Sequence, residues 1–234
     1  MLKYVNRTTR VAGLITLVLC AVCVMLMMPR VGCAMRRRRN LSQVQTMEFG
    51  DYLPMVQSGD LILFRYTATP LIHDIASPFS HVGIAIRHPE THELLLLESH
   101  NAGDAEKIGV FTGGAHLHSL AARIRSYHGD IWVCRLNRPA PDARVVELVH
   151  DRDLLSIPFE TKFVQQFIMC LLVPWVVKPT GKKMYCSQFA VHALQKLGIA
   201  SPNAVKWCAS PVDVRYTQTV DGYVYSSPIL LKVQ

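Results

Sequence analysis

Three residues of the sequence carry side chains that together can perform acyl transfer: Cys186, His81 and Glu98. Cys186 stands at the start of a predicted helix over residues 185–197, just after a glycine and two lysines. A thiolate attacks carbonyl carbon far better than a thiol does, and the unpaired N–H groups of a helix start favour the thiolate. Cys186 is therefore a candidate nucleophile, and a buried apolar filler is the alternative interpretation of the same position.

A nucleophilic cysteine needs a base, and His81 is the best candidate among the ten histidines. It begins the apolar segment SHVGIAIR (80–87), which predicts a strand. A histidine at the start of a strand is held by backbone pairing and can still face a cleft. Gly83 removes side-chain bulk beside it, which suits close approach of a ligand or of backbone.

The imidazole of His81 in turn needs an acceptor that fixes its orientation. The segment LLLLESH (94–100) predicts a strand that pairs antiparallel with 80–87, so that Glu98 and His100 share one face with His81. A carboxylate in the apolar run LLLLE is costly to bury without a partner. Glu98 is therefore the predicted orienting residue, and His100 is the alternative third residue.

The elements that must position these residues follow from the hydrophobic pattern. The predicted strands are 59–66, 80–87, 94–100, 106–111 and 130–136, and the predicted helices lie within 116–128, 142–153 and 185–197. Residues 40–57 are interpreted as a linker and entry segment. Strands that come mostly before helices predict one α+β domain built on an antiparallel sheet.

The N-terminal segment predicts a membrane anchor. Residues 11–28 are 18 uncharged residues, close to the roughly 20 that a spanning helix needs, and basic residues flank both ends. A cleaved signal peptide is the alternative, since VGCA (31–34) resembles a cleavage site. Residues 1–40 are thus the predicted anchor and residues 41–234 the predicted domain, in a single-pass membrane protein whose body is expected to be cytoplasmic. The run Arg36–Arg39 can also contact anionic headgroups.

A second apolar segment, 163–177, raises the same question. Its fifteen residues include two glutamines and a proline, which is too few to span a bilayer. A buried core helix is therefore predicted there, and a second membrane contact is the alternative.

The charge distribution argues against a nucleic-acid partner. The net charge is +8, but residues 1–40 hold eight basic and no acidic residues, which leaves 17 basic and 17 acidic residues in the domain. A nucleic-acid binder carries a basic surface that this balance does not provide. The predicted partners are membrane lipid, through residues 11–28, and a substrate.

No metal and no cofactor is predicted. The pairs His88/His92 and His116/His118 have spacings that can suit a metal, but no cysteine or carboxylate cluster near them in the sequence completes a site. These histidines are interpreted as solvated surface residues. The seven cysteines form no zinc-type pattern in the domain.

Four blocks in the order GDLILFR, SHVGIAI, LLLLES and MYCSQFAVHAL resemble the NlpC/p60 superfamily of papain-like thiol enzymes. The order His, Glu, Cys resembles its circularly permuted branch, known from bacteria and some large DNA viruses. The resemblance spans about residues 55–225 and includes WVCRLN and SPVDV as weaker features. It implies that Cys186 is the nucleophile, His81 the base and Glu98 the orienting residue, with Tyr185 lining the site and contributing to oxyanion binding. The branch often has Glu where this chain has Gln188.

The resemblance implies a membrane-anchored, cysteine-dependent hydrolase or acyltransferase that cleaves an amide or ester bond, of a lipid or a peptide, through a thioester. Two alternatives stay open. One is a catalytically silent papain-like binding or structural membrane protein. The other is a membrane-tethered adaptor of unrelated fold in which Cys186 is filler.

Overall fold

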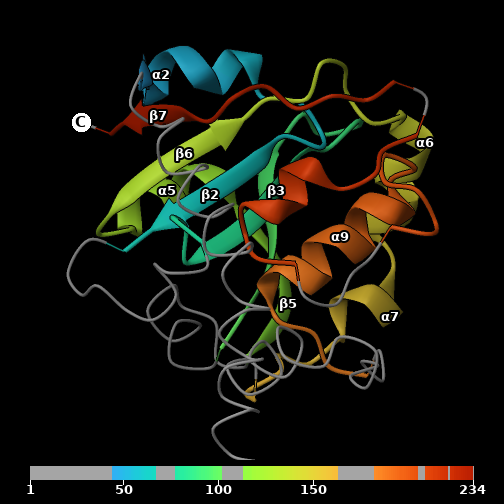
Figure 1. Cartoon of the computed structure of the whole chain (residues 1–234). Helices are drawn as coiled ribbons and strands as arrows, with labels where there is room; N and C mark the ends of the chain where they lie inside the picture. The colour runs from blue at the N-terminus through green and yellow to red at the C-terminus, as the bar shows by residue number, and fades with distance from the viewer. Residues whose placement is uncertain are drawn as a thin grey trace, which may run out of the picture.

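The computed structural model of the chain describes residues 44–66, 77–101, 113–162, 182–204, 209–220 and 222–233. In this part of the chain, strands and helices form a mixed α+β fold around one seven-stranded sheet of order β1-β7-β6-β2-β3-β4-β5 (Figure 1). The strands are β1 (Gln45–Glu48), β2 (Leu61–Arg65), β3 (His81–Arg87), β4 (Leu94–His100), β5 (Gly114–Ser119), β6 (Asp130–Cys134) and β7 (Ile229–Lys232). Among these, β1 and β7 pair in parallel and the other neighbours are antiparallel.

Short helices accompany the sheet. They are α2 (Phe49–Tyr52), α5 (Leu120–Ser126), α6 (Asp142–Val149), α7 (Arg152–Leu155) and α9 (Cys186–Lys196), with 3-10 turns η1 (Leu53–Met55) and η2 (Asp213–Tyr216). The expected α+β class and the mainly antiparallel sheet are confirmed.

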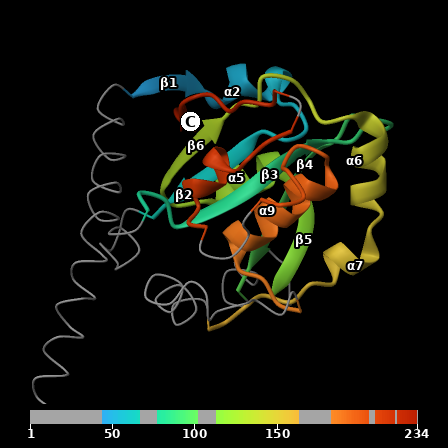
Figure 2. The ribbon, with the colours of Figure 1, turned by 45° about the vertical axis from the view of Figure 1, so that its right-hand side comes forward.

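Both faces of the central strands are buried, and each face has its own hydrophobic core. In β2, Leu61 and Leu63 join one core while Ile62 and Phe64 join the other, as the period-2 geometry of a strand requires. The first core lies under α9, α6 and α7, and the second lies under α2 and α5 (Figures 1 and 2). The two sides of the sheet are called the α9 face and the α5 face below.

The strand register agrees with the sequence at the decisive point. Gly83 of β3 lies opposite Glu98 of β4, the predicted pairing. On the other side of β4, Glu98 lies opposite His116 and Leu96 lies opposite His118. Because side chains alternate along a strand, His100, His116 and His118 share the face of Glu98. β4 thus lies between the strand of the predicted base and a strand that carries two histidines.

Three sequence expectations are corrected. Residues 40–57 are more than a linker, because 45–48 form β1 against the C-terminal strand β7, a long-range pairing with no local signal. The predicted helix within 116–128 begins only at Leu120, because residues 114–119 pair with β4 as β5. The predicted helix 142–153 is interrupted at His150, which separates α6 from α7.

Several predicted segments lie outside the described residues. These are the N-terminal anchor 11–28, the predicted strand 106–111 and the apolar segment 163–177. Within the described ranges, each helix is too short or too polar to cross a bilayer.

Candidate functional site

The side chains of His81 and Glu98 meet directly. His81 is the first residue of β3, and its Nε2 lies 2.6 Å from Oε2 of Glu98 on β4. The distance is that of a charge-assisted hydrogen bond. Glycine at position 83 permits the approach of the two strands, because a Cβ there would lie 2.8 Å from Leu96 Cδ1 and 3.3 Å from Glu98 Cβ.

Glu98 has no exposed surface, and polar groups from three elements surround it. Arg123 of α5 donates from Nε to Oε1 over 2.8 Å, and His118 of β5 places Nε2 2.9 Å from the same oxygen. Burial alone would raise the pKa of Glu98. The charge of His81, the close contacts of His118 and His81 and the charge of Arg123 outweigh burial and lower the pKa well below its ordinary value. The carboxylate is therefore ionised at neutral pH.

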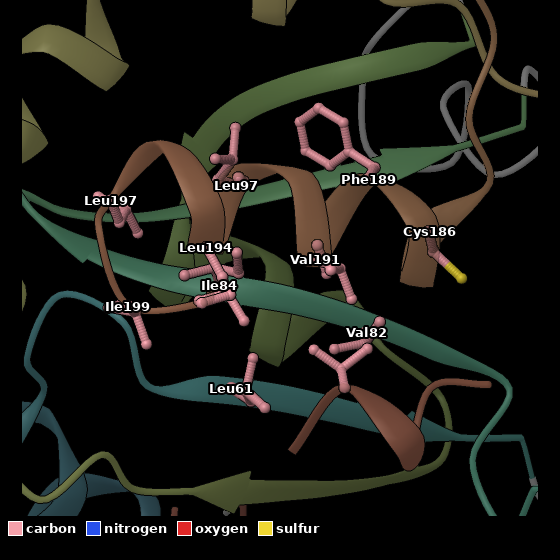
Figure 3. Close-up of a cluster of buried hydrophobic side chains, with 14 of the residues drawn as sticks. Leu61, Val82, Ile84, Leu97, Cys186, Phe189, Val191, Leu194, Leu197 and Ile199 are labelled. Carbon is pink, nitrogen blue, oxygen red and sulfur yellow. The ribbon is translucent and has the colours of Figure 1, made fainter. Parts of the chain in front are cut away.

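The thiol approaches from the opposite side of the sheet. Cys186 is the first residue of α9 and packs with Val82 in the core of the α9 face, whereas His81 and Glu98 belong by alternation to the α5 face. Figure 3 shows Cys186 at the N-terminal end of α9, near Val82 at the start of β3. The Cys186 side chain acts on His81 there, because its charge and its hydrogen-bonding capacity help to raise the pKa of the imidazole. Since Nε2 faces Glu98, Nδ1 is the ring nitrogen left for the thiol.

The charge state of His81 follows from these two neighbours. Burial would lower the pKa of His81, but the Glu98 carboxylate and the Cys186 sulfur raise it to about 10. The imidazole is thus a cation at neutral pH, held between a carboxylate and a sulfur. A protonated imidazole beside a thiol is an arrangement that suits a thiol nucleophile.

The backbone before Cys186 is tied to the sheet. Ser99 of β4 donates its hydroxyl to the carbonyl of Met184 over 3.2 Å, and residue 184 also bridges to residue 159. Tyr185, the residue before the helix, is buried, and its N–H donates to the side chain of Gln188 over 3.4 Å. Gln188 therefore has a structural partner at the position where the permuted branch often carries Glu.

His100 is buried beside the site but does not meet His81 in the way that Glu98 does. Its Nδ1 makes a long contact of 3.4 Å with the carbonyl of Asn101, and its ring stacks on His116 with centroids 4.8 Å apart. Burial and the nearby histidines lower the pKa of His100 to about 4, against the opposing effect of Glu98. It is neutral at neutral pH.

Sequence reasoning misjudged one residue of this cluster and missed another. His118 is not a solvated surface residue, because the β4–β5 register brings it to Glu98. The expectation that no carboxylate lies near this histidine was wrong for the same reason, since Glu98 is distant in the sequence but close in the fold. Arg123 was not identified, since 25 positions separate it from Glu98 and no spacing rule joins them. The available signal was the buried carboxylate itself, which requires a cationic partner.

Comparisons with known proteins add little. No family model matches the chain. The curated proteins contain no match either. Among solved structures, the chain is similar to the crystal structure of the metalloprotein YiiX from Escherichia coli O157:H7, at 16% identity and a TM-score of 0.38. The similarity covers 60% of this chain and 66% of that one, just under two thirds. Agreement of this size assigns neither a fold family nor a function to the chain.

Proposed function

We propose that the chain is a cysteine-dependent hydrolase or acyltransferase that cleaves an amide or ester bond through a thioester on Cys186. One observation carries the proposal: the imidazole of His81 lies 2.6 Å from the Glu98 carboxylate, and the Cys186 thiol, at a helix start, is near enough to raise the pKa of that imidazole. A thiol, an imidazole and a carboxylate gathered in this way suit covalent catalysis by a thiol.

Each residue has a distinct role in the proposed reaction. The Cys186 sulfur attacks the carbonyl carbon, and the Cys186 N–H, with Tyr185 nearby, stabilises the oxyanion of the tetrahedral intermediate. His81 Nδ1 then gives its proton to the leaving amine or alcohol, which leaves the acyl group on sulfur as a thioester. His81 next removes a proton from water, or from an acceptor alcohol or amine, which attacks the thioester and regenerates the thiol. Glu98 holds the ring in position and stabilises its positive form.

The finer assignment of fold and location belongs to the same proposal. The order of His81, Glu98 and Cys186 along the chain, together with the four sequence blocks, supports a permuted papain-like domain of NlpC/p60 type. The uncharged segment 11–28 supports a single-pass anchor that holds the domain at a membrane, with the body in the cytoplasm and a lipid or peptide substrate nearby. Carbonate extraction of membranes distinguishes an anchored protein from a released one.

The decisive experiment measures thiol reactivity at Cys186 against an internal reference. The full chain is alkylated with iodoacetamide for increasing times, and mass spectrometry follows the peptides that contain Cys186 and Cys134. Cys134 is buried in β6, and burial raises its pKa to about 12. We expect Cys186 to react at least about 100-fold faster than Cys134 at pH 7. His81→Ala should remove most of this difference.

Turnover is tested with a panel of small activated esters and amides. Hydrolysis that Cys186→Ala abolishes, with an unchanged circular dichroism spectrum, would establish the enzyme. A Cys186 that reacts no faster than Cys134 would contradict the proposal. A reactive Cys186 without turnover on any substrate would favour the silent binding protein.

A further inference from the structure

The α5 face of β4 and β5 brings together more ligating groups than the proposed reaction uses. Glu98, His100 and His118 each offer one ligand atom, and these atoms all lie within 4.8 Å of one another. Glu98 and His100 are two positions apart on β4, so they share a face, and His118 lies opposite Leu96 on the same face. The proposed reaction uses Glu98 alone of these three.

The two histidines have ring nitrogens that no described residue satisfies. His100 is 2% exposed, and its Nε2 has no hydrogen-bond partner in the part of the chain that the structure describes. His118 Nδ1 is in the same condition there. Leaving a buried polar group unpaired destabilises the folded state. A metal ion that accepts the lone pair of His100 Nε2 would satisfy this nitrogen. The contact between His118 and Glu98 leaves it unsatisfied.

We propose that Glu98, His100 and His118 form a binding site for a divalent transition-metal ion, with Zn²⁺ as the reference ion. Two imidazoles and one carboxylate are a ligand set that zinc and related ions use when one coordination position stays open. Bonds of about 2.1 Å place tetrahedral ligands about 3.4 Å apart. His118 Nε2 already lies 2.9 Å from Glu98 Oε1, so small rotations of these side chains are enough to admit the ion.

Arg123 would compete with the metal ion for Oε1 of Glu98. Its Nε lies 2.8 Å from Oε1 of Glu98, the oxygen on the His118 side, while Oε2 holds His81. A metal ion on Oε1 takes the place of the guanidinium, and Oε2 stays on the imidazole. The metal site therefore shares its carboxylate with the thiol centre without sharing His81.

This sharing has a consequence that rests on the proposed function. A metal ion on Oε1 repositions the carboxylate whose Oε2 lies 2.6 Å from His81 Nε2. The imidazole is then held less firmly beside Cys186, so metal binding slows the reaction of the thiol. Changes in the partners of a metal or catalytic group typically amount to about 10- to 100-fold, and we expect alkylation of Cys186 to slow by that factor in saturating Zn²⁺.

Metal binding is measured first, because it does not depend on the thiol reaction. The full chain is titrated with Zn²⁺ against a chromophoric chelator, and Co²⁺ loading is followed by its visible absorption, which reports the ligand set. We expect one site whose affinity falls at least about tenfold in His100→Ala and His118→Ala. His128→Ala is the matched control, since His128 is exposed in the segment after α5 and its loss should leave the affinity unchanged.

The outcomes separate the two proposals. Cys186→Ala should bind Zn²⁺ as the parent chain does, so binding without thiol reactivity supports the metal site and refutes the enzyme. The metal site alone is overturned if Cys186 is reactive but the chain binds no stoichiometric Zn²⁺. It is also overturned if His118→Ala and His128→Ala bind Zn²⁺ with equal affinity. His118 is partly exposed, so its variant should retain the parent circular dichroism spectrum even if His100→Ala does not. Zn²⁺ that binds but leaves Cys186 alkylation unchanged refutes the coupling.

Discussion

Two carboxylates, Glu98 and Asp60, are completely buried in the same sheet region, yet their surroundings drive them in opposite directions. Glu98 faces Arg123 and His81, and its pKa is lowered well below the ordinary value. Burial raises the pKa of Asp60 to about 6, because hydrogen bonds and a more distant Arg135 offset burial only in part. Both side chains have no exposed surface, so burial alone does not explain the difference.

The partners of Asp60 are mostly neutral and structural. Its Oδ1 accepts the N–H of Leu136 over 2.8 Å, and its Oδ2 accepts the Tyr52 hydroxyl over 3.1 Å and the Gln57 N–H over 3.3 Å. The guanidinium of Arg135 is 4.0 Å away and partly exposed. Asp60 thus ties the start of β2 to the segment after β6, and it does so as a hydrogen-bond acceptor.

The comparison teaches how a buried acid is assigned to function or to structure. Glu98 has ionic partners in direct contact, one of which, His81, also neighbours the Cys186 thiol, so its negative charge is used. Asp60 has backbone and hydroxyl donors, so its shape and acceptor capacity are used and its charge is a cost. A shift in pKa indicates a functional site only when the cause is a specific charged partner.

The largest expected effect comes from neutralising Glu98 as its amide. Glu98→Gln removes the charge that holds His81 and Arg123. We expect alkylation of Cys186 to slow by about 100-fold or more. We also expect the free energy of unfolding to fall by about 3–5 kcal/mol, because buried charge is left without compensation. Kinetics of alkylation and urea titration measure the two quantities.

Asp60→Asn is the counterpart in that comparison. Asp60 precedes β2 and His81 lies opposite Phe64, about 13 Å along the strand. We expect the alkylation rate of Cys186 in Asp60→Asn to stay within about twofold of the rate in the parent chain, since distant sites couple by less than about 0.5 kcal/mol. Equal losses of Cys186 reactivity in the two variants would show that both act through general loss of structure.

The second effect is a pH dependence that belongs to Asp60. Its pKa rises from 3.8 in the unfolded chain to about 6 in the folded one, so the folded state binds the proton more tightly. The stabilising contribution is complete below about pH 4 and is lost as the pH rises through about 6, by about 3 kcal/mol in total. Burial of His100 has the opposite effect over this range, because it lowers the pKa of His100 to about 4, so the loss is measured as the parent profile minus the Asp60→Asn profile in urea titrations from pH 4 to 7. Parallel profiles would contradict the assignment.

The smallest effect concerns the space beside Glu98. Gly83→Ala adds a Cβ that would lie 2.8 Å from Leu96 Cδ1, so the two strands must shift. Overpacking of this kind costs about 1–3 kcal/mol. We expect thermal unfolding at lower temperature and slower alkylation of Cys186 than in the parent, but faster than in Glu98→Gln. Gly50→Ala is the control, because nothing lies within 4 Å of a Cβ there. If Gly83→Ala were as stable as the parent chain, β3 and β4 would have room for a Cβ at this position, contrary to the prediction.

Much of the sheet and the core of the site were predictable from the sequence because their signals are local. Continuous apolar runs in 59–66 and 80–87 predict buried strands, and a glycine near a histidine predicts close approach. Antiparallel pairing of 80–87 with 94–100 puts His81 and Glu98 on one face. The pairing of β1 with β7 was missed because its partners lie at opposite ends of the domain. The membrane anchor stays a prediction.

The sequence by itself determined which side chains share a strand face and that a cysteine begins a helix, since chain geometry repeats every two residues in strands and every 3.6 in helices. Only the tertiary structure decided that this cysteine, from the α9 face, meets a histidine of the α5 face at the start of β3. It also decided that Arg123 and His118 surround Glu98 while Asp60 receives mostly neutral donors. The physical reason is that a charge state depends on every group packed around it, and packing joins residues that no local pattern connects.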